Sequence, residues 1–199
     1  HSHLEPYFGP RIDLAYLFVH RGLDFLKRGG RLALLSTAYW LMASGAEQLR
    51  RDLQTRAEPV AFVRTPGERL FDAAPGHHSL VSLFERTAAG EESGERPTAC
   101  TVSGEVERWS EWMEAVVEDR VEEEFSRRAS VTRPPPSAFS RGGWTPFASE
   151  KTRAWAEKLR ELGTPLGRLV DDRQGFVSGA DRVTRRRLGQ IEGTVDEVE

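Results

Sequence analysis

Side chains that could read a nucleic acid gather near the end of the sequence, in residues 174–187. Glutamine and arginine can each make two parallel hydrogen bonds to a base edge, glutamine to adenine and arginine to guanine. Glycines let the backbone come close to a duplex. The candidate base contacts are Gln174, Gly175, Ser178, Gly179, Asp181 and Arg182. The alternative is an ordinary surface β-turn with solvated arginines.

The arginine run Arg185, Arg186 and Arg187 would contact phosphates, which positions a protein on DNA without specifying a sequence. The net charge of −3 does not by itself indicate a nucleic-acid binder. That sum hides an uneven distribution, because residues 105–124 carry nine Glu or Asp while residues 182–187 carry four arginines. We expect the acidic stretch to be a solvated or partner-facing surface that repels DNA wherever it is exposed.

The other reactive side chains predict neither a metal site nor a nucleophile. His77 and His78 are adjacent, so they point apart on an extended chain, and no third ligand lies nearby in the sequence. They could contact phosphate or be solvated. Ser79 has no base and orienting group at suitable positions. Cys100 is the single cysteine, which excludes an internal disulfide and a cysteine-rich zinc site and fits a reducing cytoplasm.

Composition predicts a soluble, cytoplasmic, globular protein. Hydrophobic residues make up 38% of the chain and charged residues 30%. No run of eighteen apolar residues occurs, so we expect no membrane span. The first residues contain neither an initiator Met nor an apolar signal core, so no targeting peptide is expected.

The first third of the chain predicts an alternation of helices and strands. Asp13 is a candidate N-cap for a helix whose apolar stripe is Leu14, Leu17, Phe18, Phe25 and Leu26, with Lys27 and Arg28 in its last turn and Gly29-Gly30 as its stop. Residues 31–36 read as a strand buried on both faces. Ser44 and Glu47 form a capping box for a second helix. Strands at 60–64 and 79–84 follow, so the pattern predicts an α/β fold with a mainly parallel sheet.

The rest of the chain predicts a connector and a second domain. Residues 87–104 read as a loop or hairpin, and residues 110–128 as an acidic helix. Prolines 134–136 predict an extended spacer. A second amphipathic helix over 149–162 ends at Gly163, followed by a glycine-punctuated, β-like stretch. We place domains at 1–105, 106–148 and 149–199.

Several of these stretches resemble the type II and IIG adenine-specific DNA methyltransferases. The matching pieces are Asp13-Leu-Ala-Tyr-Leu-Phe18, Leu26-Lys-Arg-Gly-Gly-Arg-Leu-Ala-Leu-Leu35, Tyr39-Trp-Leu41, Leu49-Arg50 and Leu70-Phe71. The family has Tyr, Pro and Pro where this chain has Ala15, Arg28 and Thr37. Each piece is weak alone, and the ordered set at matching spacing is moderately specific.

A second stretch resembles the entry to the target-recognition domain of the same enzymes. Pro165-Leu-Gly-Arg-Leu-Val170 is followed by Gln174-Gly-Phe-Val-Ser-Gly-Ala-Asp-Arg182, where the family prefers Thr for Ser178 and Asn for Asp181. Trp144 and the helix at 149–162 fit the usual lead-in. The matches leave residues 87–140 uncovered.

The resemblance implies the C-terminal half of a Rossmann-like, S-adenosylmethionine-dependent methyltransferase sheet. A helical connector and the start of a mixed α/β recognition domain would follow. The glycine-rich cofactor loop and the Asn-Pro-Pro-Tyr motif that accepts the target amine are absent, and we expect both upstream of His1. Glu5-Pro6-Tyr7 is interpreted as a chance likeness to the second motif. The partners implied are DNA and the N-terminal half of the same protein.

By the same resemblance, Phe71 would stack against an adenine extruded from the duplex. The alternative is a core residue at a strand end. Such a half sheet should expose an unpaired edge and an apolar face, which predicts poor solubility and little activity alone. Two other functions stay open: a non-catalytic DNA-binding or specificity module on the same scaffold, and a methyltransferase acting on RNA or another substrate.

Overall fold

The computed structural model describes residues 5–7, 12–65, 79–88, 94–102, 108–121, 129–140 and 142–170. The chain divides into two compact units, residues 1–154 and 155–199. Each unit is described by itself.

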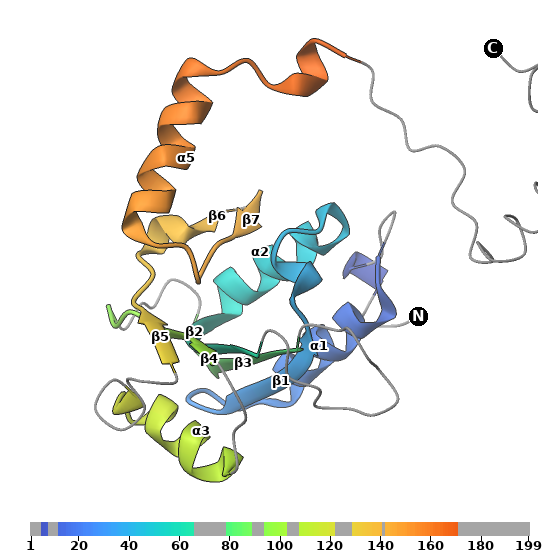
Figure 1. The fold of residues 1–199 in the computed structure, drawn as a ribbon. Coiled ribbons are helices and arrows are strands. Elements are labelled where there is room, and N and C mark those ends of the chain that lie inside the picture. Colours follow the sequence, from blue (N-terminus) through green and yellow to red (C-terminus); the bar gives the residue numbers. More distant parts are fainter. Residues whose placement is uncertain are drawn as a thin grey trace, which may run out of the picture. The chain divides into compact units, whose positions relative to one another are not determined.

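A sheet of five strands organises the first unit (Figure 1). Its strands are β1 (Arg31–Thr37), β2 (Ala57–Thr65), β3 (Ser79–Arg86), β4 (Thr98–Val102) and β5 (Ala129–Thr132), in the order β1-β3-β2-β4-β5. β3 is antiparallel to both of its neighbours, β2 and β4 are parallel, and β5 is antiparallel to β4. The α/β class is confirmed. The expected mainly parallel sheet is wrong, because β3 follows β2 and returns between it and β1.

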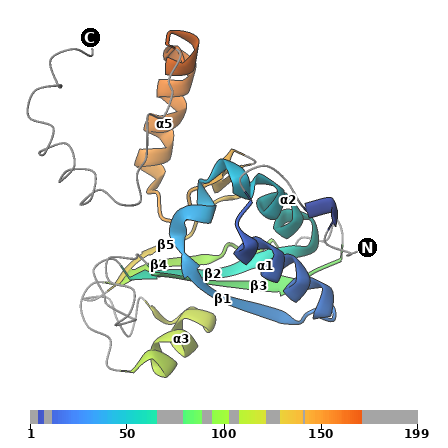
Figure 2. The ribbon, with the colours of Figure 1, turned by 90° about the vertical axis from the view of Figure 1, so that its right-hand side faces the viewer.

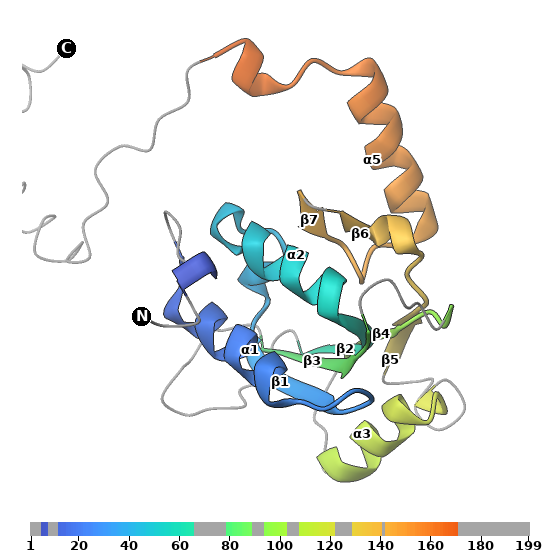
Figure 3. The ribbon, with the colours of Figure 1, turned by 180° about the vertical axis from the view of Figure 1, so that it is seen from behind.

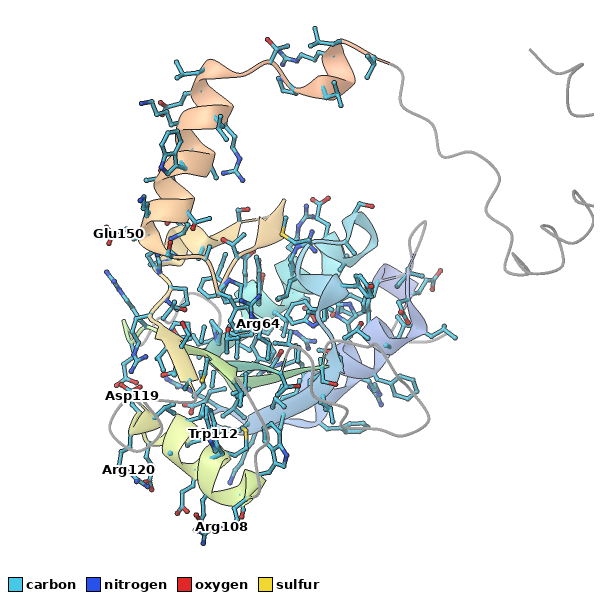
Figure 4. The ribbon with its side chains drawn as sticks, viewed as in Figure 1. Arg64, Arg108, Trp112, Asp119, Arg120 and Glu150 are labelled. Atoms are coloured by element: carbon cyan, nitrogen blue, oxygen red, sulfur yellow. The ribbon has the colours of Figure 1, made fainter. Side chains whose placement is uncertain are left out.

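Helices cover both faces of this sheet (Figure 2). α1 (Leu14–Phe25) and α2 (Glu47–Arg56) lie side by side on one face, as the view from behind also shows (Figure 3). α3 (Trp109–Val117) covers the other face and buries Trp112 against the sheet (Figure 4). Because both faces are covered, the inner strands are apolar on both sides.

The predicted N-cap of α1 is confirmed, and its predicted apolar stripe is only partly buried. The Asp13 carboxylate accepts a hydrogen bond from the Ala15 backbone N–H at 2.9 Å. The side chains that α1 buries are Val19, His20 and Leu23. Of the predicted stripe, Leu14, Phe18 and Phe25 are exposed by 69%, 78% and 76%, while Leu26 packs against the core. α1 therefore carries apolar residues on two faces, of which only one packs against the sheet.

Helix boundaries near the turns also differ from expectation. α1 ends at Phe25, so Lys27 and Arg28 lie in the following turn, where Gly29 takes a φ of 72°. The capping box is wrong, because Ser44 begins a short 3-10 turn, η3 (Ser44–Ala46), that directly follows η2 (Ala38–Leu41). Ala46 then stands at the N-cap of α2 and has no side-chain oxygen to offer.

The structure differs from the prediction for residues 87–128. It has a strand of the main sheet where a loop or hairpin is predicted, and the helix that follows is shorter than predicted. β4 lies inside the predicted loop 87–104. α3 ends at Val117, and Asp119 adopts a left-handed conformation with a φ of 58°. The Thr98 hydroxyl donates to the Asp119 carboxylate at 2.8 Å, and Arg133 pairs with the same carboxylate. These contacts fix the end of α3, so the helix predicted over 110–128 does not run through residue 119. Residues 122–128 lie outside the described part.

An aromatic cluster attaches the proline-rich segment to the sheet. After the 3-10 turn η4 (Pro136–Ala138), the strands β6 (Phe139–Ser140) and β7 (Gly143–Trp144) form a small hairpin. The ring centroid of Trp144 lies 5.4 Å from that of Trp40 and 5.2 Å from that of Phe139. Phe62 and Phe84 complete the cluster. The domain boundaries at 105 and 148 stay predictions.

The last α-helix among the described residues, α5 (Glu150–Leu162), is followed by the 3-10 turn η5 (Leu166–Arg168). The part of α5 that belongs to the second unit includes Trp155, Leu159 and Leu162. Their side chains have exposed fractions of 57%, 65% and 77%. The Gly163 backbone N–H donates to the Leu159 carbonyl at 2.8 Å, at the predicted end of the helix. Among the described helices, none combines the length and apolar composition that crossing a membrane requires.

Candidate functional site

The carboxyl ends of β1 and β2 lie at one edge of the sheet, and β3 begins there. Thr37 at the end of β1 and Thr65 at the end of β2 both pair with Ser79, the first residue of β3. In open α/β sheets, ligands bind outside the carboxyl ends of the strands. Because Thr65 and Ser79 flank residues 66–78, the segment that contains Phe71 leaves and re-enters the sheet at this edge. Phe71 itself lies outside the described residues.

A buried arginine fixes the turn that follows β1. Arg50 on α2 is 1% exposed and donates from Nη1 to the carbonyl oxygens of Trp40, at 2.8 Å, and Ala43, at 2.9 Å. Burial lowers the pKa of the Arg50 guanidinium, since desolvation disfavours its charge. The Tyr39 carbonyl accepts hydrogen bonds from the backbone N–H groups of Met42 and Ala43. The turn is therefore held from inside the core.

The side chains of Tyr39 and Trp40 point in opposite directions from this turn, one to solvent and one into the core. Trp40 is 3% exposed and packs in the aromatic cluster, whereas Tyr39 is 75% exposed. Met42, 58% exposed, packs against Gly143, where an added Cβ would lie 2.6 Å from the Met42 sulfur. Only glycine fits there without displacing Met42. The turn thus exposes the Tyr39 ring to solvent, while Arg50 and the buried Trp40 side chain hold its backbone in place.

Two further polar groups lie near the carboxyl end of β2. Arg64 donates from Nε to the Thr101 hydroxyl at 2.8 Å, and its guanidinium lies 4.5 Å from the centre of the Phe147 ring (Figure 4). The Thr65 hydroxyl is buried and finds no hydrogen-bond partner among the residues that the structure describes. Arg64 and Thr65 therefore lie at the same end of the sheet as the Tyr39 turn, with β3 between β2 and β1.

A buried ionic network lies between α1 and α2. His20 Nδ1 lies 2.6 Å from the Asp52 carboxylate, and Arg56 joins Asp52 at 2.7 Å and Asp24 at 2.6 Å. Desolvation raises the pKa of Asp52, and the hydrogen bonds from His20 and Arg56 outweigh it, so the pKa is lowered. The Tyr7 ring stacks on His20 with centroids 3.8 Å apart, and burial raises the pKa of the Tyr7 hydroxyl. The network ties the two helices together.

Sequence reasoning missed this network and the role of Arg50. A signal was present, since Asp52 and Arg56 are four residues apart on α2, a spacing that places them on one helix face. His20 follows the buried Val19 on α1. The pairing of His20 with Asp52 requires the two helices to be adjacent, which no local pattern encodes.

The predicted nucleic-acid contacts are not in the described part of the structure. Residues 174–187, His77 and His78 all lie outside it. Within the described ranges, no group of three His, Cys, Asp or Glu side chains could hold a metal ion. Cys100 lies in the middle of β4, fully buried, and desolvation raises the pKa of its thiol to about 12. Such a thiol stays protonated and unreactive at neutral pH.

Comparison with known proteins identifies a shared fold. No protein-family model matches the chain, and no curated protein sequence matches it. A chain from a structure on complex assembly and conformational transition of the type I restriction-modification system matches 96% of this chain, with 19% identity and a TM-score of 0.50. The type IIG restriction endonuclease BpuSI matches 77%, with 15% identity and a TM-score of 0.49. A modification subunit of a putative type I restriction enzyme from Vibrio vulnificus YJ016 matches 59%, with 16% identity and a TM-score of 0.45.

The matched region is a minor part of each of these proteins. It spans 41% of the type I system chain, 18% of BpuSI and 27% of the Vibrio subunit. At this level of identity, the match over 96% of the chain shows a common fold.

Proposed function

We propose that this chain is part of an S-adenosylmethionine-dependent DNA methyltransferase of a restriction-modification system, one that modifies the exocyclic amino group of adenine. The observation that carries the proposal is the fold match over 96% of the chain to a type I restriction-modification chain. The ordered sequence resemblance is a second line of support, because two of its matching pieces contact each other. Arg50, in the Leu49-Arg50 piece on α2, donates to the Trp40 carbonyl in the Tyr39-Trp-Leu41 piece.

Two open surfaces support the view that the whole enzyme is larger. The outer edge of β1 has no partner among the described strands, although four consecutive residues of β1, Leu32 to Leu35, are apolar. Leu35 on this strand is 48% exposed, and the outer stripe of α1 is exposed as well. An uncharged, apolar edge strand invites pairing with another strand. In this proposal a preceding half of the same protein covers both surfaces and carries the cofactor loop and the amine-accepting motif.

The residues of this chain would bind and orient DNA. Phe71 would form one wall of the pocket that receives the extruded adenine and replaces part of its lost stacking. Gln174 to Arg182 would read base edges, and Arg185, Arg186 and Arg187 would contact phosphates. S-adenosylmethionine, when bound, supplies the methyl group. Holding the amine in line with that group is the main contribution expected of the protein.

The test uses the full reading frame that encodes this chain, expressed in a host without adenine methylation. We expect N6-methyladenine at one sequence motif in the host DNA, and strong loss of the mark in the Phe71→Ala variant. Host DNA without the mark, from a soluble and folded full-length protein, would contradict the proposal.

A second candidate function is a DNA-binding or specificity module without catalysis. Its favouring observation is that the arginine run 185–187 lies in a chain that contains no glycine-rich cofactor motif. This function predicts DNA binding by the chain alone, strongly weakened by salt and independent of S-adenosylmethionine.

A further inference from the structure

An exposed aromatic ring projects from a rigid part of the candidate site. Tyr39 is 75% exposed, yet its neighbour Trp40 is buried, and Arg50 holds the backbone that follows it through the carbonyls of Trp40 and Ala43. No hydrogen bond to the Tyr39 hydroxyl forms within the described ranges. Exposing a fixed aromatic ring to water forgoes the burial of a large apolar surface. A ligand that stacks on the ring would recover that burial.

The register of the sheet places the Tyr39 turn at the same end of the strands as Thr65 and Ser79, the described residues on either side of residues 66–78. Tyr39 follows Thr37 by two residues, Thr37 pairs with Ser79, and Ser79 is the first residue after the 66–78 segment. Both ends of that segment and the Tyr39 turn therefore belong to the same sheet edge. Phe18 on α1 is a useful contrast, since it is 78% exposed but lies on a helix and not in the turn that Arg50 holds.

We propose that Tyr39 is a second base-stacking residue of the DNA site, which contacts an unstacked nucleobase of the bound strand. This inference rests on the proposed function, since only a DNA-modifying site would bring unstacked bases to this edge. Extruding one base leaves neighbouring bases without a stacking partner, and an aromatic side chain can take that place. The tyrosine ring provides the π face, and its hydroxyl keeps it compatible with a wet interface.

The test measures binding of the chain to a fluorescein-labelled single-stranded 12-mer by anisotropy at low salt. We expect Tyr39→Ala to weaken binding by about 5- to 150-fold, because stacking of one base on an aromatic ring contributes about 1–3 kcal/mol. Tyr39→Phe keeps the ring and should bind within about two-fold of the unaltered chain. Phe18→Ala removes an equally exposed ring elsewhere and should leave binding unchanged. Thermal unfolding of each variant checks that the fold is intact.

A parallel measurement with a duplex separates this inference from the proposed function. The role of Tyr39 would be overturned if the chain bound both DNA forms and Tyr39→Ala had no effect. It would also be overturned if Tyr39→Ala and Phe18→Ala weakened binding equally. In either case DNA binding by the chain would still stand. Binding of duplex but not single strand would have the same meaning. If the chain binds neither form, the stacking role is overturned together with DNA binding by this chain.

Discussion

His20 and Asp52, from two different helices, meet at 2.6 Å in the buried interface between α1 and α2. Asp52 is 8% exposed and also pairs with Arg56. The carboxylate is thus the shared partner of two groups. Its removal would leave the buried His20 Nδ1 without this partner and Arg56 with Asp24 and the His20 carbonyl as its remaining acceptors.

We expect Asp52→Ala to lower the free energy of unfolding by about 3–5 kcal/mol, the usual cost of breaking a buried ion pair from one side. Glu47→Ala is the matched control, because Glu47 lies on the same helix and pairs with Arg51 while 54% exposed. It should cost about 0.5 kcal/mol or less. Chemical denaturation of the two variants checks this, and equal costs would contradict a stabilising role for the network.

The same carboxylate predicts a dependence of stability on pH. The pKa of Asp52 is lowered in the folded state because His20 and Arg56 donate to it, against the effect of desolvation. A group with a depressed pKa stabilises the fold above its unfolded pKa, about 3.9 for Asp, and this stabilisation is lost as pH falls through the folded value. We expect unfolding midpoints to fall as pH drops below about 4. In Asp52→Asn this acid decline should be shallower; an identical decline would show that other carboxylates dominate.

Asp119 combines a left-handed backbone with hydrogen bonds from Thr98 and Arg133. Asn tolerates this conformation and keeps an acceptor, so Asp119→Asn should change stability by less than about 0.5 kcal/mol. Ala has neither property, and Asp119→Ala should cost about 1–3 kcal/mol. Thermal unfolding of the pair is the measurement. If both variants melted together, the side-chain contacts at the end of α3 would contribute nothing.

Cys100 should not react with thiol reagents in the folded protein at pH 8. Its thiol is buried in β4 and has a pKa raised to about 12, so the reactive thiolate is scarce and inaccessible. Labelling in denaturant should be fast and stoichiometric. Native labelling as fast as that of the denatured chain would mean that β4 opens readily.

DNA binding through the arginine run should depend on salt. Replacing Arg185 and Arg186 by Ala should reduce the slope of log K against log salt by about 2, since each phosphate contact contributes about 0.9 on duplex DNA. The control replaces Arg51 and Arg108, whose side chains are 50% and 74% exposed, and removes the same charge elsewhere. Similar slope changes in both double variants would point to a diffuse charge effect.

The sequence predicted the elements better than their arrangement. α1, its Asp13 cap and the strands after Gly30 followed from local signals. The inner face of α1 did not, because Leu14 and Phe18 form a stripe as apolar as the one containing Val19 and Leu23. Periodicity measures how apolar a face is, and it cannot tell which of two apolar faces meets the sheet.

Strand pairing was equally hidden from local patterns. β3 reads as an ordinary apolar strand, and its antiparallel position between β1 and β2, like that of β5 beside β4, makes the sheet mixed. In the candidate site, Tyr39 was visible only as part of a family-like turn, since its exposure depends on Trp40 taking the buried place. The roles of Phe71 and of residues 174–187 stay predictions.

The aromatic cluster links parts of the chain that are made at very different times. Trp40 and Phe62 leave the ribosome long before Phe139 and Trp144, which pack against them. A nascent chain that stops at residue 132 would contain the five described strands of the main sheet and still lack the Phe139 and Trp144 side chains that cover Trp40 and Phe62. Completion of this core therefore waits for the hairpin, and stalled or shortened products should be cleared by proteases far faster than chains that extend past residue 144.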